Sequence, residues 1–347
     1  MKIFVTGGAG FIGSSFVRLC VNRGYDVVNI DALTYSGLLS NVESVSGCQN
    51  YQFANLDIRD LEALTRLFDY HEPDAVVHLA AESHVDNSIK GPSEFISTNI
   101  VGTFNILEAS RHYWLKKGRF DNFRFLHVST DEVFGSLGPV GSFSEDSPYA
   151  PRSPYSASKA SSDHLVRAWN ETYGLPTLIT NCSNNYGPHQ FPEKLIPTVI
   201  LNSLQEKIIP IYGDGSNVRD WLFVDDHADA LLKVLVSGVV GRSYNIGGNN
   251  EFSNLELVDG ICVILDKVLP RRYGFYSDLI DFVGDRPGHD QRYSIDSSRI
   301  KSELGWTPSV DFQTGLDLTV RWYLNNRDWW LPLLENHRLG NRFGESL

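Results

Sequence analysis

Cysteine and long apolar runs are scarce in this sequence. Four cysteines occur in 347 residues, and they form neither a CxxC pair nor a zinc-ligand spacing. A disulfide framework and a zinc site are therefore not expected. No apolar run approaches the roughly 18 residues of a membrane helix, and the apolar run at the N-terminus is too short for a signal peptide. We expect reduced thiols in the protein core at four positions: Cys20, Cys48, Cys182 and Cys262.

Positively charged residues are fewer than negatively charged ones: the chain has 30 Lys and Arg residues and 42 Asp and Glu residues, which gives a formal net charge of −12. Proteins that bind a nucleic acid backbone usually present a basic face, so nucleic acid is not an expected partner. The apolar fraction of 42% and the charged fraction of 21% are ordinary for a globular protein. At roughly 150 residues per domain, the chain has room for about two domains. We expect an acidic, soluble protein of the cytoplasm.

Short β-rich runs alternate with longer helical patterns in the first half of the chain. Strands are expected at residues 2–6, 27–30, 51–54, 75–79 and 125–129. Helices are expected between and after them, at residues 11–22, 60–70, 93–117 and 154–173. This alternation indicates right-handed βαβ units and a doubly wound parallel sheet, the α/β Rossmann fold.

The pattern becomes less regular after residue 180. Residues 181–192 and 284–288 are rich in Asn, Gly or Pro and are expected to be loops. We expect residues 1–180 to form a dinucleotide-binding domain, which further segments around 220–248 rejoin. Residues 181–347 are expected to form mainly a smaller substrate-binding lobe.

A glycine pattern, GGAGFIG at residues 7–13, follows the first expected strand and opens the first expected helix. Its glycines permit a tight turn, a close approach to a pyrophosphate and close helix–strand packing, and the helix N-terminus favours phosphate charge. Asp31 ends the next strand, eighteen residues after Gly13. A carboxylate there accepts hydrogen bonds from ribose hydroxyls and repels a 2′-phosphate. The pattern predicts NAD rather than NADP, with a plain βα turn as the alternative.

Asp57 and Ile58 lie just past the third expected strand. At this place Asp57 is either a contact of the adenine or the N-cap of the next helix.

Tyr155 and Lys159 are four residues apart at the start of the helix expected from residue 154. They share a helix face, where the ammonium is expected to lower the pKa of the phenol from about 10 toward that of a general base. Thr130 ends the preceding strand, and Asp131 and Glu132 follow at the sheet edge where ligands react. An acid and a base beside a redox site indicate elimination of water as well as oxidation. An exposed helix start and a surface acidic turn are the alternatives.

The glycine pattern and the Tyr155–Lys159 pair together resemble the extended short-chain dehydrogenase/reductases that act on nucleotide sugars. Along nearly its whole length the chain is similar to the dTDP-glucose 4,6-dehydratase family. The resemblance implies an NAD-dependent lyase that converts the nucleotide-linked glucose to its 4-keto-6-deoxy derivative and water. The matching segments are residues 31–37 (DALTYSG), 80–86 (AAESHVD), 130–133 (TDEV), 155–165 (YSASKASSDHL), 181–188 (NCSNNYGP), 191–197 (FPEKLIP), 213–222 (GDGSNVRDWL) and 285–293 (DRPGHDQRY).

The resemblance also implies roles for single residues, and no metal. The implied catalytic residues are Thr130, Asp131 as acid, Glu132 as base, Tyr155 and Lys159. NAD contacts are implied for the last two and for Gly7, Gly10, Phe11, Ile12, Gly13, Asp31, Leu33, Thr34, Asp57, Ile58, Ala80, Ala81, Ser83 and Asn99. Substrate contacts are implied for Ser83, His84, Thr130, Asn184, Lys194, Leu195, Arg219, Arg286, His289 and Tyr293. In an acidic protein, the two arginines are the best candidates for binding the diphosphate.

The sequence leaves alternatives for the substrate, for the activity and for the role of one histidine. Leu38, Asn87 and Phe134 replace the Asn, Arg and Tyr usual in the family, so UDP-glucose or a related nucleotide hexose remains an alternative substrate. A nucleotide-sugar 4-epimerase shares the fold, NAD and the Tyr–Lys pair, and an inactive NAD-binding regulator is a further alternative. The adjacent carboxylates argue against both. For His84, a purely structural role is an alternative.

An apolar stripe on the helix expected at 93–117, with the helix at 154–173, predicts a homodimer. Related enzymes pair these helices into a four-helix bundle across a twofold axis. The alternative is that the stripe packs only on its own sheet. Trp329 and Trp330 are expected to serve packing. The stripe consists of Phe95, Ile96, Ile100, Phe104 and Leu107.

Overall fold

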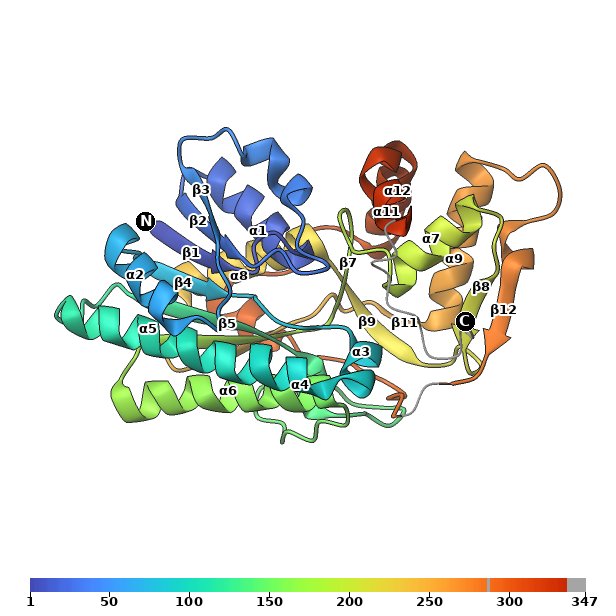
Figure 1. The fold of residues 1–347 in the computed structure, drawn as a ribbon. Coiled ribbons are helices and arrows are strands. Elements are labelled where there is room, and N and C mark those ends of the chain that lie inside the picture. The colour runs from blue at the N-terminus through green and yellow to red at the C-terminus, as the bar shows by residue number, and fades with distance from the viewer. Residues whose placement is uncertain (286–287, 336–347) are drawn as a thin grey trace.

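A seven-stranded parallel sheet forms the centre of the computed structural model, which describes residues 1–285 and 288–335 (Figure 1). The strand order is β10-β6-β5-β4-β1-β2-β3, and every neighbouring pair is parallel. This arrangement confirms the expected Rossmann fold. The strands are β1 (Lys2–Thr6), β2 (Asp26–Asp31), β3 (Tyr51–Asn55), β4 (Ala75–His78), β5 (Arg124–Thr130), β6 (Thr177–Cys182) and β10 (Ser243–Ile246).

The strand order reverses direction beside β1, because β2 and β3 lie on one side of it and β4, β5 and β6 lie on the other. Such a switch point leaves a crevice at the carboxyl ends of the strands, where ligands bind in open α/β sheets.

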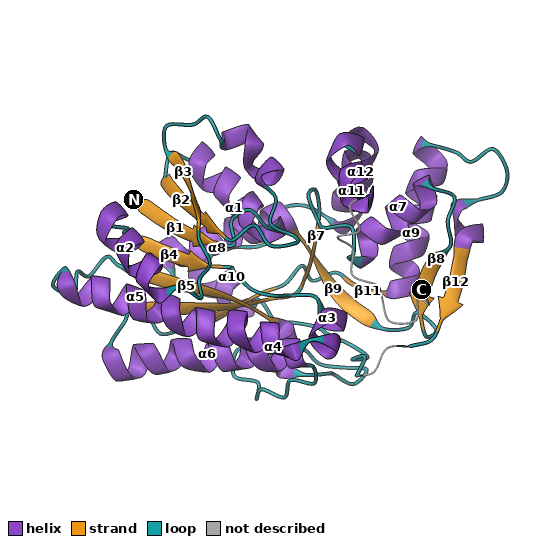
Figure 2. Cartoon of the chain, viewed as in Figure 1, coloured by secondary structure: helices purple, strands orange, loops and turns teal. Residues whose placement is uncertain are grey.

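Helices cover both faces of this sheet (Figure 2). One face packs on α1 (Phe11–Asn22), α8 (Val224–Ser237) and α10 (Ser298–Leu304). The other face packs on α2 (Leu61–His71), α5 (Thr103–Lys116) and α6 (Pro154–Tyr173). Each face has its own buried apolar cluster, and the two clusters together form the core around the main sheet. This double cover explains why its strands are near-continuous apolar runs.

The helix expected at 93–117 is present, but it is not a uniform α-helix. It begins as α4 (Pro92–Phe95), continues as a π-helical segment, η2 (Ile96–Gly102), and ends as α5. Segments of π-helix are rare and are frequently found at functional sites.

A second apolar core lies among elements that follow residue 180. Its helices are α7 (Leu195–Leu204), α9 (Asn254–Val268), α11 (Phe312–Asn325) and α12 (Arg327–Glu335). Two small sheets complete it: β7 (Asn184–Tyr186), β9 (Val218–Phe223) and β11 (Glu251–Ser253) form one, and β8 (Ile209–Tyr212) and β12 (Ile280–Val283) form the other. We propose that these elements are the smaller lobe. From the segment around 220–248, β10 joins the main sheet as a strand and α8 packs on it. Helix α10 also packs on the main sheet, which was not expected from the sequence.

The prediction that residues 181–192 are all loop is wrong. β6 extends to Cys182, and residues 184–186 form β7, which pairs in parallel with β9. Asparagines have low strand propensity, so the local sequence gives no strand signal here. The pairing depends on β9, more than thirty residues later in the chain, and on burial of Tyr186 in the second core.

The short elements that remain are η1 (Leu39–Val45), α3 (Val85–Lys90), η3 (Asp131–Phe134) and η4 (Tyr276–Leu279). All four cysteines are free; three are buried, whereas Cys48 is partly exposed rather than in the core. Within residues 1–285 and 288–335, none of the helices has both the length and the apolarity needed to cross a membrane.

Candidate active site

A cavity of about 370 Å³ opens at the carboxyl ends of β1, β2, β4, β5 and β6. It brings together the glycine turn, Asp31, the segment after β4 and the five predicted catalytic residues. Of the residues predicted to contact NAD, all line this cavity except Leu33 and Asn99.

The glycine turn is shaped by close packing at two positions and by the cavity at a third. A Cβ on Gly7, whose φ is +71°, would come within 2.7 Å of the Ala80 amide nitrogen, and one on Gly13 within 2.1 Å of the Gly7 carbonyl oxygen. A Cβ on Gly10 would meet only the Gly7 carbonyl oxygen, at 3.3 Å, yet Gly10 lines the cavity at the N-cap of α1. Glycine is therefore required there for access to the helix N-terminus, as a pyrophosphate needs.

Asp31 is held in place by backbone amides. Its Oδ2 accepts a hydrogen bond from the Ala9 amide at 2.9 Å, and its Oδ1 accepts one from the Leu33 amide at 2.8 Å. Burial raises the pKa of Asp31, and these two amide bonds oppose that rise. Leu33 thus acts through its backbone, in a left-handed conformation with φ +52°. A fixed carboxylate at this edge fits the ribose of NAD and disfavours NADP.

Asp57 is not a helix N-cap, so that alternative is wrong. The N-cap of α2 is Asp60, which accepts a hydrogen bond from the Ala63 amide at 2.9 Å. Asp57 lines the cavity and pairs with Arg59 at 2.7 Å. Ile58 beside it is buried and also lines the cavity.

Asn99 lies behind the cavity wall, on the π-helical segment. Its Oδ1 accepts a hydrogen bond from the Glu82 amide at 2.8 Å, and its Nδ2 donates to Ser158 Oγ at 2.8 Å. The carbonyl of Asn99 accepts a further hydrogen bond from Ser162 Oγ at 2.6 Å. Asn99 therefore ties the segment after β4 to the catalytic helix α6 and does not contact the cavity itself.

The predicted catalytic residues meet at the end of β5 and the start of α6. Thr130 caps η3, and Asp131 and Glu132 form its first turn. Tyr155 and Lys159 lie one turn apart on α6, and both are buried. Pro154 and a capping box at Ser153 fix where this helix begins, and with it the direction of the two side chains.

The two neighbouring carboxylates differ in environment. Asp131 is 1% exposed, whereas Glu132 is half-buried. Burial, followed by the charges of Glu132 and Asp220, raises the pKa of Asp131 well above its ordinary value. This shift favours the protonated form of Asp131, the form that a general acid requires.

Lys159 does not lower the pKa of Tyr155 in this structure, contrary to expectation. Burial and the charge of Glu132 raise the pKa of Tyr155 well above 10. Lys159 Nζ instead donates to the Val128 carbonyl at 2.9 Å. The i, i+4 spacing places both groups on one cavity wall, but the lysine is directed at the strand backbone.

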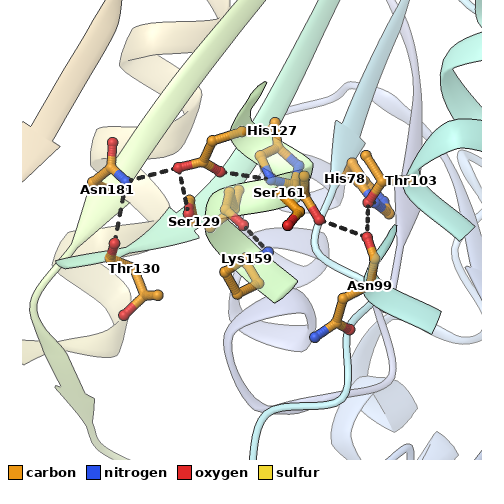
Figure 3. A network of polar contacts seen from close by, with 12 residues as sticks. His78, Asn99, Thr103, His127, Ser129, Thr130, Lys159, Ser161 and Asn181 are labelled. Atoms are coloured by element: carbon orange, nitrogen blue, oxygen red, sulfur yellow. Dashed lines mark hydrogen bonds and ion pairs between the residues drawn. The ribbon is translucent and has the colours of Figure 1, made fainter. Parts of the chain in front are cut away.

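A buried polar network, which the sequence analysis did not identify, lies beneath these residues (Figure 3). Its centre is Asp163, whose Oδ1 is 3.1 Å from His127 Nε2, with both side chains fully buried. Its Oδ2 accepts hydrogen bonds from Tyr149, Ser129 and Asn181, at 2.7, 3.0 and 3.3 Å.

Asp163 is charged despite its burial. Burial raises its pKa, but the hydrogen bond and charge of His127, together with Lys159 and Tyr149, outweigh burial and hold the pKa below its ordinary value. The only sequence signal is that Asp163 follows Lys159 by four residues on the same helix face.

A second cavity, of about 190 Å³, lies beside the first and extends toward the smaller lobe. Ser83, Glu132, Asn184, Glu193 and Lys194 line both cavities and therefore join them. The predicted substrate residues found here are Ser83, His84, Asn184, Lys194, Leu195, Arg219, His289 and Tyr293. Thr130 lines the first cavity only, and Arg286 lies outside the described residues.

Several lining residues of the second cavity were not predicted. They come from β8 and from the start of α9: Pro210, Ile211, Tyr212 and Asn254. A short strand and a helix start carry no motif of their own, and only the fold brings them to the cavity.

Arg219 supplies positive charge to the second cavity. The side chain is 5% exposed and donates to the carbonyls of Val218 and Asp290, each at 2.8 Å. Its guanidinium lies 4.4 Å from the centre of the Tyr293 ring. A buried, oriented cation of this kind suits a diphosphate.

His84 has a structural role as well as a place in the cavity wall. Its Nδ1 accepts a hydrogen bond from the Asn87 amide at 3.3 Å and caps α3. Its Nε2 lies 3.8 Å from Glu193 Oε2, at the junction of the two cavities. Among the described residues, no cluster of His, Cys, Asp and Glu side chains is arranged to hold a metal ion.

Comparison with known proteins places the chain among sugar-nucleotide enzymes. Residues 4–319 match the family model described as GDP-mannose 4,6 dehydratase. The dTDP-glucose 4,6-dehydratase of Escherichia coli is 53% identical, over 99% of each chain. The structure of the dTDP-glucose 4,6-dehydratase of Streptomyces venezuelae, determined with NAD bound, is 46% identical and superposes with a TM-score of 0.88, covering 96% of this chain and 100% of that one.

A solved epimerase is also similar, but less so. The UDP-glucose 4-epimerase of Thermotoga maritima is 30% identical, with a TM-score of 0.83 over 94% of this chain and 100% of that one. Fold, site geometry and similarity agree: this chain belongs to the dTDP-glucose 4,6-dehydratase family, within the broader family of GDP-mannose 4,6 dehydratases.

Proposed function

We propose that this protein is an NAD-dependent hydro-lyase that converts dTDP-glucose to dTDP-4-keto-6-deoxyglucose and water. The observation that carries this proposal is the pair Asp131 and Glu132 beside Tyr155. One carboxyl group is buried with a raised pKa, and its neighbour is half-buried in the wall shared by both cavities. Simple oxidoreduction and epimerisation need no such acid and base.

The reaction requires the sugar to be oxidised before water can leave. The C6 hydroxyl is a poor leaving group and the C5 proton is not acidic, but a ketone at C4 makes the C5 proton acidic through the enolate. When bound, NAD⁺ accepts a hydride from C4 and later returns it to C6. The chain supplies the remaining proton transfers.

Three residues have the chemistry for these transfers. Tyr155 would remove the proton of the 4-hydroxyl as a phenolate, which the positive charge of a bound nicotinamide would favour against the burial that raises its pKa. Glu132 would remove the C5 proton and return it to C5 after hydride has reached C6. Asp131 protonates the departing C6 oxygen, which its raised pKa permits. Thr130 positions the phenol through a side-chain hydrogen bond, and Lys159 lines the same cavity wall.

The residues that would hold NAD are those of the first cavity. The glycine turn and the N-terminus of α1 take the pyrophosphate, Asp31 takes the adenosine ribose, and Asp57 and Ile58 border the adenine. The second cavity, with Arg219, takes the nucleoside diphosphate of the substrate.

None of the three departures from the usual family pattern, Leu38, Asn87 and Phe134, lines either cavity. Phe134 is buried and stacks on Phe143 with ring centres 5.2 Å apart. Leu38 contributes its backbone amide to the Ala9 carbonyl at 3.0 Å. We therefore expect these residues to have no part in the dehydration step. The preference for one nucleotide is decided by comparing dTDP-glucose with UDP-glucose.

The test is incubation of the purified protein with dTDP-glucose, with UDP-glucose in parallel. A 4-keto-6-deoxy product absorbs after alkali treatment, and we expect this absorbance with dTDP-glucose. A product of galactose configuration would identify an epimerase instead. The absence of any product, in a protein that retains NAD, would support a binding protein without activity.

We also propose that the protein is a homodimer. Phe95 and Leu107, from the predicted stripe, are buried within the chain itself, but Ile96 and Phe104 are 54% and 39% exposed. Val101 between them is exposed as well. This unpaired apolar face on the helix 92–116 supports pairing with a second copy. Four free cysteines are in keeping with the reducing cytoplasm, which we propose as its location.

A further inference from the structure

Two segments far apart in the sequence, residues 32–45 and 187–194, together form part of the wall of the first cavity; we call them the paired wall. They contact each other directly. Tyr35 donates its hydroxyl to Glu193 Oε1 at 2.9 Å, and its ring meets the Phe191 ring edge-on with centres 5.5 Å apart. Neither segment contains a long helix or a strand of the main sheet, so other contacts must hold it in place.

The C-terminal helices supply such contacts to both segments. Trp329 on α12 donates its indole N–H to Asn41 Oδ1 at 2.8 Å, and Tyr323 on α11 donates its hydroxyl to the Gln190 carbonyl. These pairs are separated by 288 and 133 residues in the chain. In Figure 1, α11 and α12 lie between the main sheet and the rest of the smaller lobe.

Asn41 connects Trp329 to the glycine turn. The residue is 2% exposed, and its Nδ2 donates to the Ala9 carbonyl at 2.9 Å. Arg18 on α1 donates to the carbonyl of Asn41. With Trp329 in place, both polar atoms of the buried amide are hydrogen-bonded. Without it, Oδ1 loses this partner, which is costly for a buried acceptor.

An aromatic cluster fixes the position of Trp329. Its ring lies 4.9 Å from that of Trp322 and 5.7 Å from that of His189. His189 has φ +66° and belongs to the paired wall. Burial and the charge of Arg18 lower the pKa of His189 to about 3, so that its ring is neutral near pH 7 and packs as an apolar group.

We propose that Trp329 is a positioning residue for the cofactor. It anchors Asn41, which in turn fixes the Ala9 carbonyl of the glycine turn and the paired wall, and it thereby slows the release of NAD. The role suits an enzyme whose cofactor is regenerated in each turnover and need not leave. This inference rests on the proposed function for the presence of NAD, but not on the identity of the sugar.

The test compares two variants of the same helix in the full-length protein. Trp329→Phe keeps the ring and removes the indole N–H that reaches Asn41. Trp330→Phe is the matched control, because its indole N–H donates to the Tyr323 carbonyl at 2.8 Å within the smaller lobe. NAD release is followed by repeated desalting of the purified protein and quantification of the dinucleotide that remains bound.

We expect Trp329→Phe to release NAD about five-fold to ten-fold faster than the unchanged protein, the effect of one lost hydrogen bond of about 1 kcal/mol. Trp330→Phe should release it at the unchanged rate. Activity that Trp329→Phe loses on desalting should return when NAD is added, which a misfolded protein would not show.

The outcomes separate this role from the proposed function. Equal release rates for Trp329→Phe and the unchanged protein would overturn the role of Trp329 alone. Equally fast release from both variants would mean that α12 acts only through general stability, and would overturn it as well. An unchanged protein that neither retains nor binds added NAD would overturn the proposed function, and this inference with it.

Discussion

Asp131 and Glu132 are adjacent in the sequence, yet the protein gives them different environments. Asp131 is buried at the end of β5, where burial and neighbouring carboxylates raise its pKa well above its ordinary value. Glu132 lies where the two cavities join. The division into acid and base, which the sequence analysis took from family resemblance, thus has a physical counterpart in the difference in exposure.

The two proton acceptors can be separated by substitution. Tyr155→Phe removes the base for the 4-hydroxyl, so no reduced cofactor should appear after mixing with dTDP-glucose. Glu132→Gln should still oxidise C4 and accumulate reduced cofactor, because only the C5 proton transfer is blocked. Loss of one positioned base lowers turnover by about 10²–10⁴-fold. Single-turnover absorbance of the reduced nicotinamide distinguishes the two, and its absence in Glu132→Gln would make the carboxylate pair structural.

Asp131 should reduce stability as the pH rises. Its pKa is raised in the folded state, so folding favours its protonated form, and this contribution is complete below the unfolded pKa of about 3.9 and is lost as the pH rises through the folded pKa. Asp131→Asn removes the titrating group at nearly constant size. We expect the variant to be inactive but to gain melting temperature over the unchanged protein as the pH rises from about 4, the ordinary pKa of an aspartate. A pH-independent difference in melting temperature would contradict the raised pKa.

Asp163 should show the opposite dependence. Its pKa is lowered in the folded state, so its contribution is present above the unfolded pKa and is lost as the pH falls through the folded pKa. Asp163→Asn keeps the shape but weakens hydrogen bonds to a charged group, each of which contributes about 1.5–3 kcal/mol. We expect a loss of about 3 kcal/mol in the free energy of unfolding at pH 7 by urea titration, which should shrink only as the pH falls below about 4, the unfolded pKa of an aspartate. Ser129→Ala, which removes one neutral donor, should cost less.

Local signals predict some elements well and miss others for definite reasons. β1, the glycine turn and α1 follow from short-range patterns, and so do Tyr155 and Lys159, which one helical turn brings together. β7 depends on pairing with a distant strand, and Asn41 meets Trp329 across 288 residues. Asp163 was visible as a helix-face neighbour of Lys159, but its significance depends on His127, a residue of another element.

At the level of the turn and helix, Gly13 should be the strictest position. A Cβ there would lie 2.1 Å from the Gly7 carbonyl oxygen, a backbone atom that cannot yield without moving the turn. We expect Gly13→Ala to lose more than about 100-fold in NAD affinity, because the variant displaces a pyrophosphate site worth about 3 kcal/mol. Gly47→Ala is the control, because a Cβ at Gly47 meets no atom within 4 Å. Isothermal titration of NAD into both variants gives the comparison, and equal affinities would contradict the assigned turn.

The whole molecule combines the proposed cofactor site, on the core around the main sheet, with the proposed substrate site, which reaches a second core. The five residues shared by both cavities lie where these sites meet, so the reacting carbon of the sugar is expected at that junction. Such a division is expected from the sequence, because the glycine pattern and the arginine-bearing motifs lie in different halves of the chain. The sequence could not predict that α10 returns to the main sheet, since a seven-residue helix carries no signal of its partner.

The exposed face of the helix 92–116 leads to the last prediction, which concerns assembly. Ile96, Val101 and Phe104 are exposed together on this helix, and the Phe104 ring meets Trp169 of α6 edge-on at 5.8 Å. The two helices therefore present one apolar surface, whose burial by a second copy is favoured by the hydrophobic effect. We expect sedimentation to give about twice the 38.9 kDa mass of one chain, and Phe104→Glu to give single chains, because each copy would bury an unpaired carboxylate. Val236→Glu, at a position of α8 that is 55% exposed, should remain dimeric. A mass of one chain for the unchanged protein at micromolar concentration would rule out the dimer.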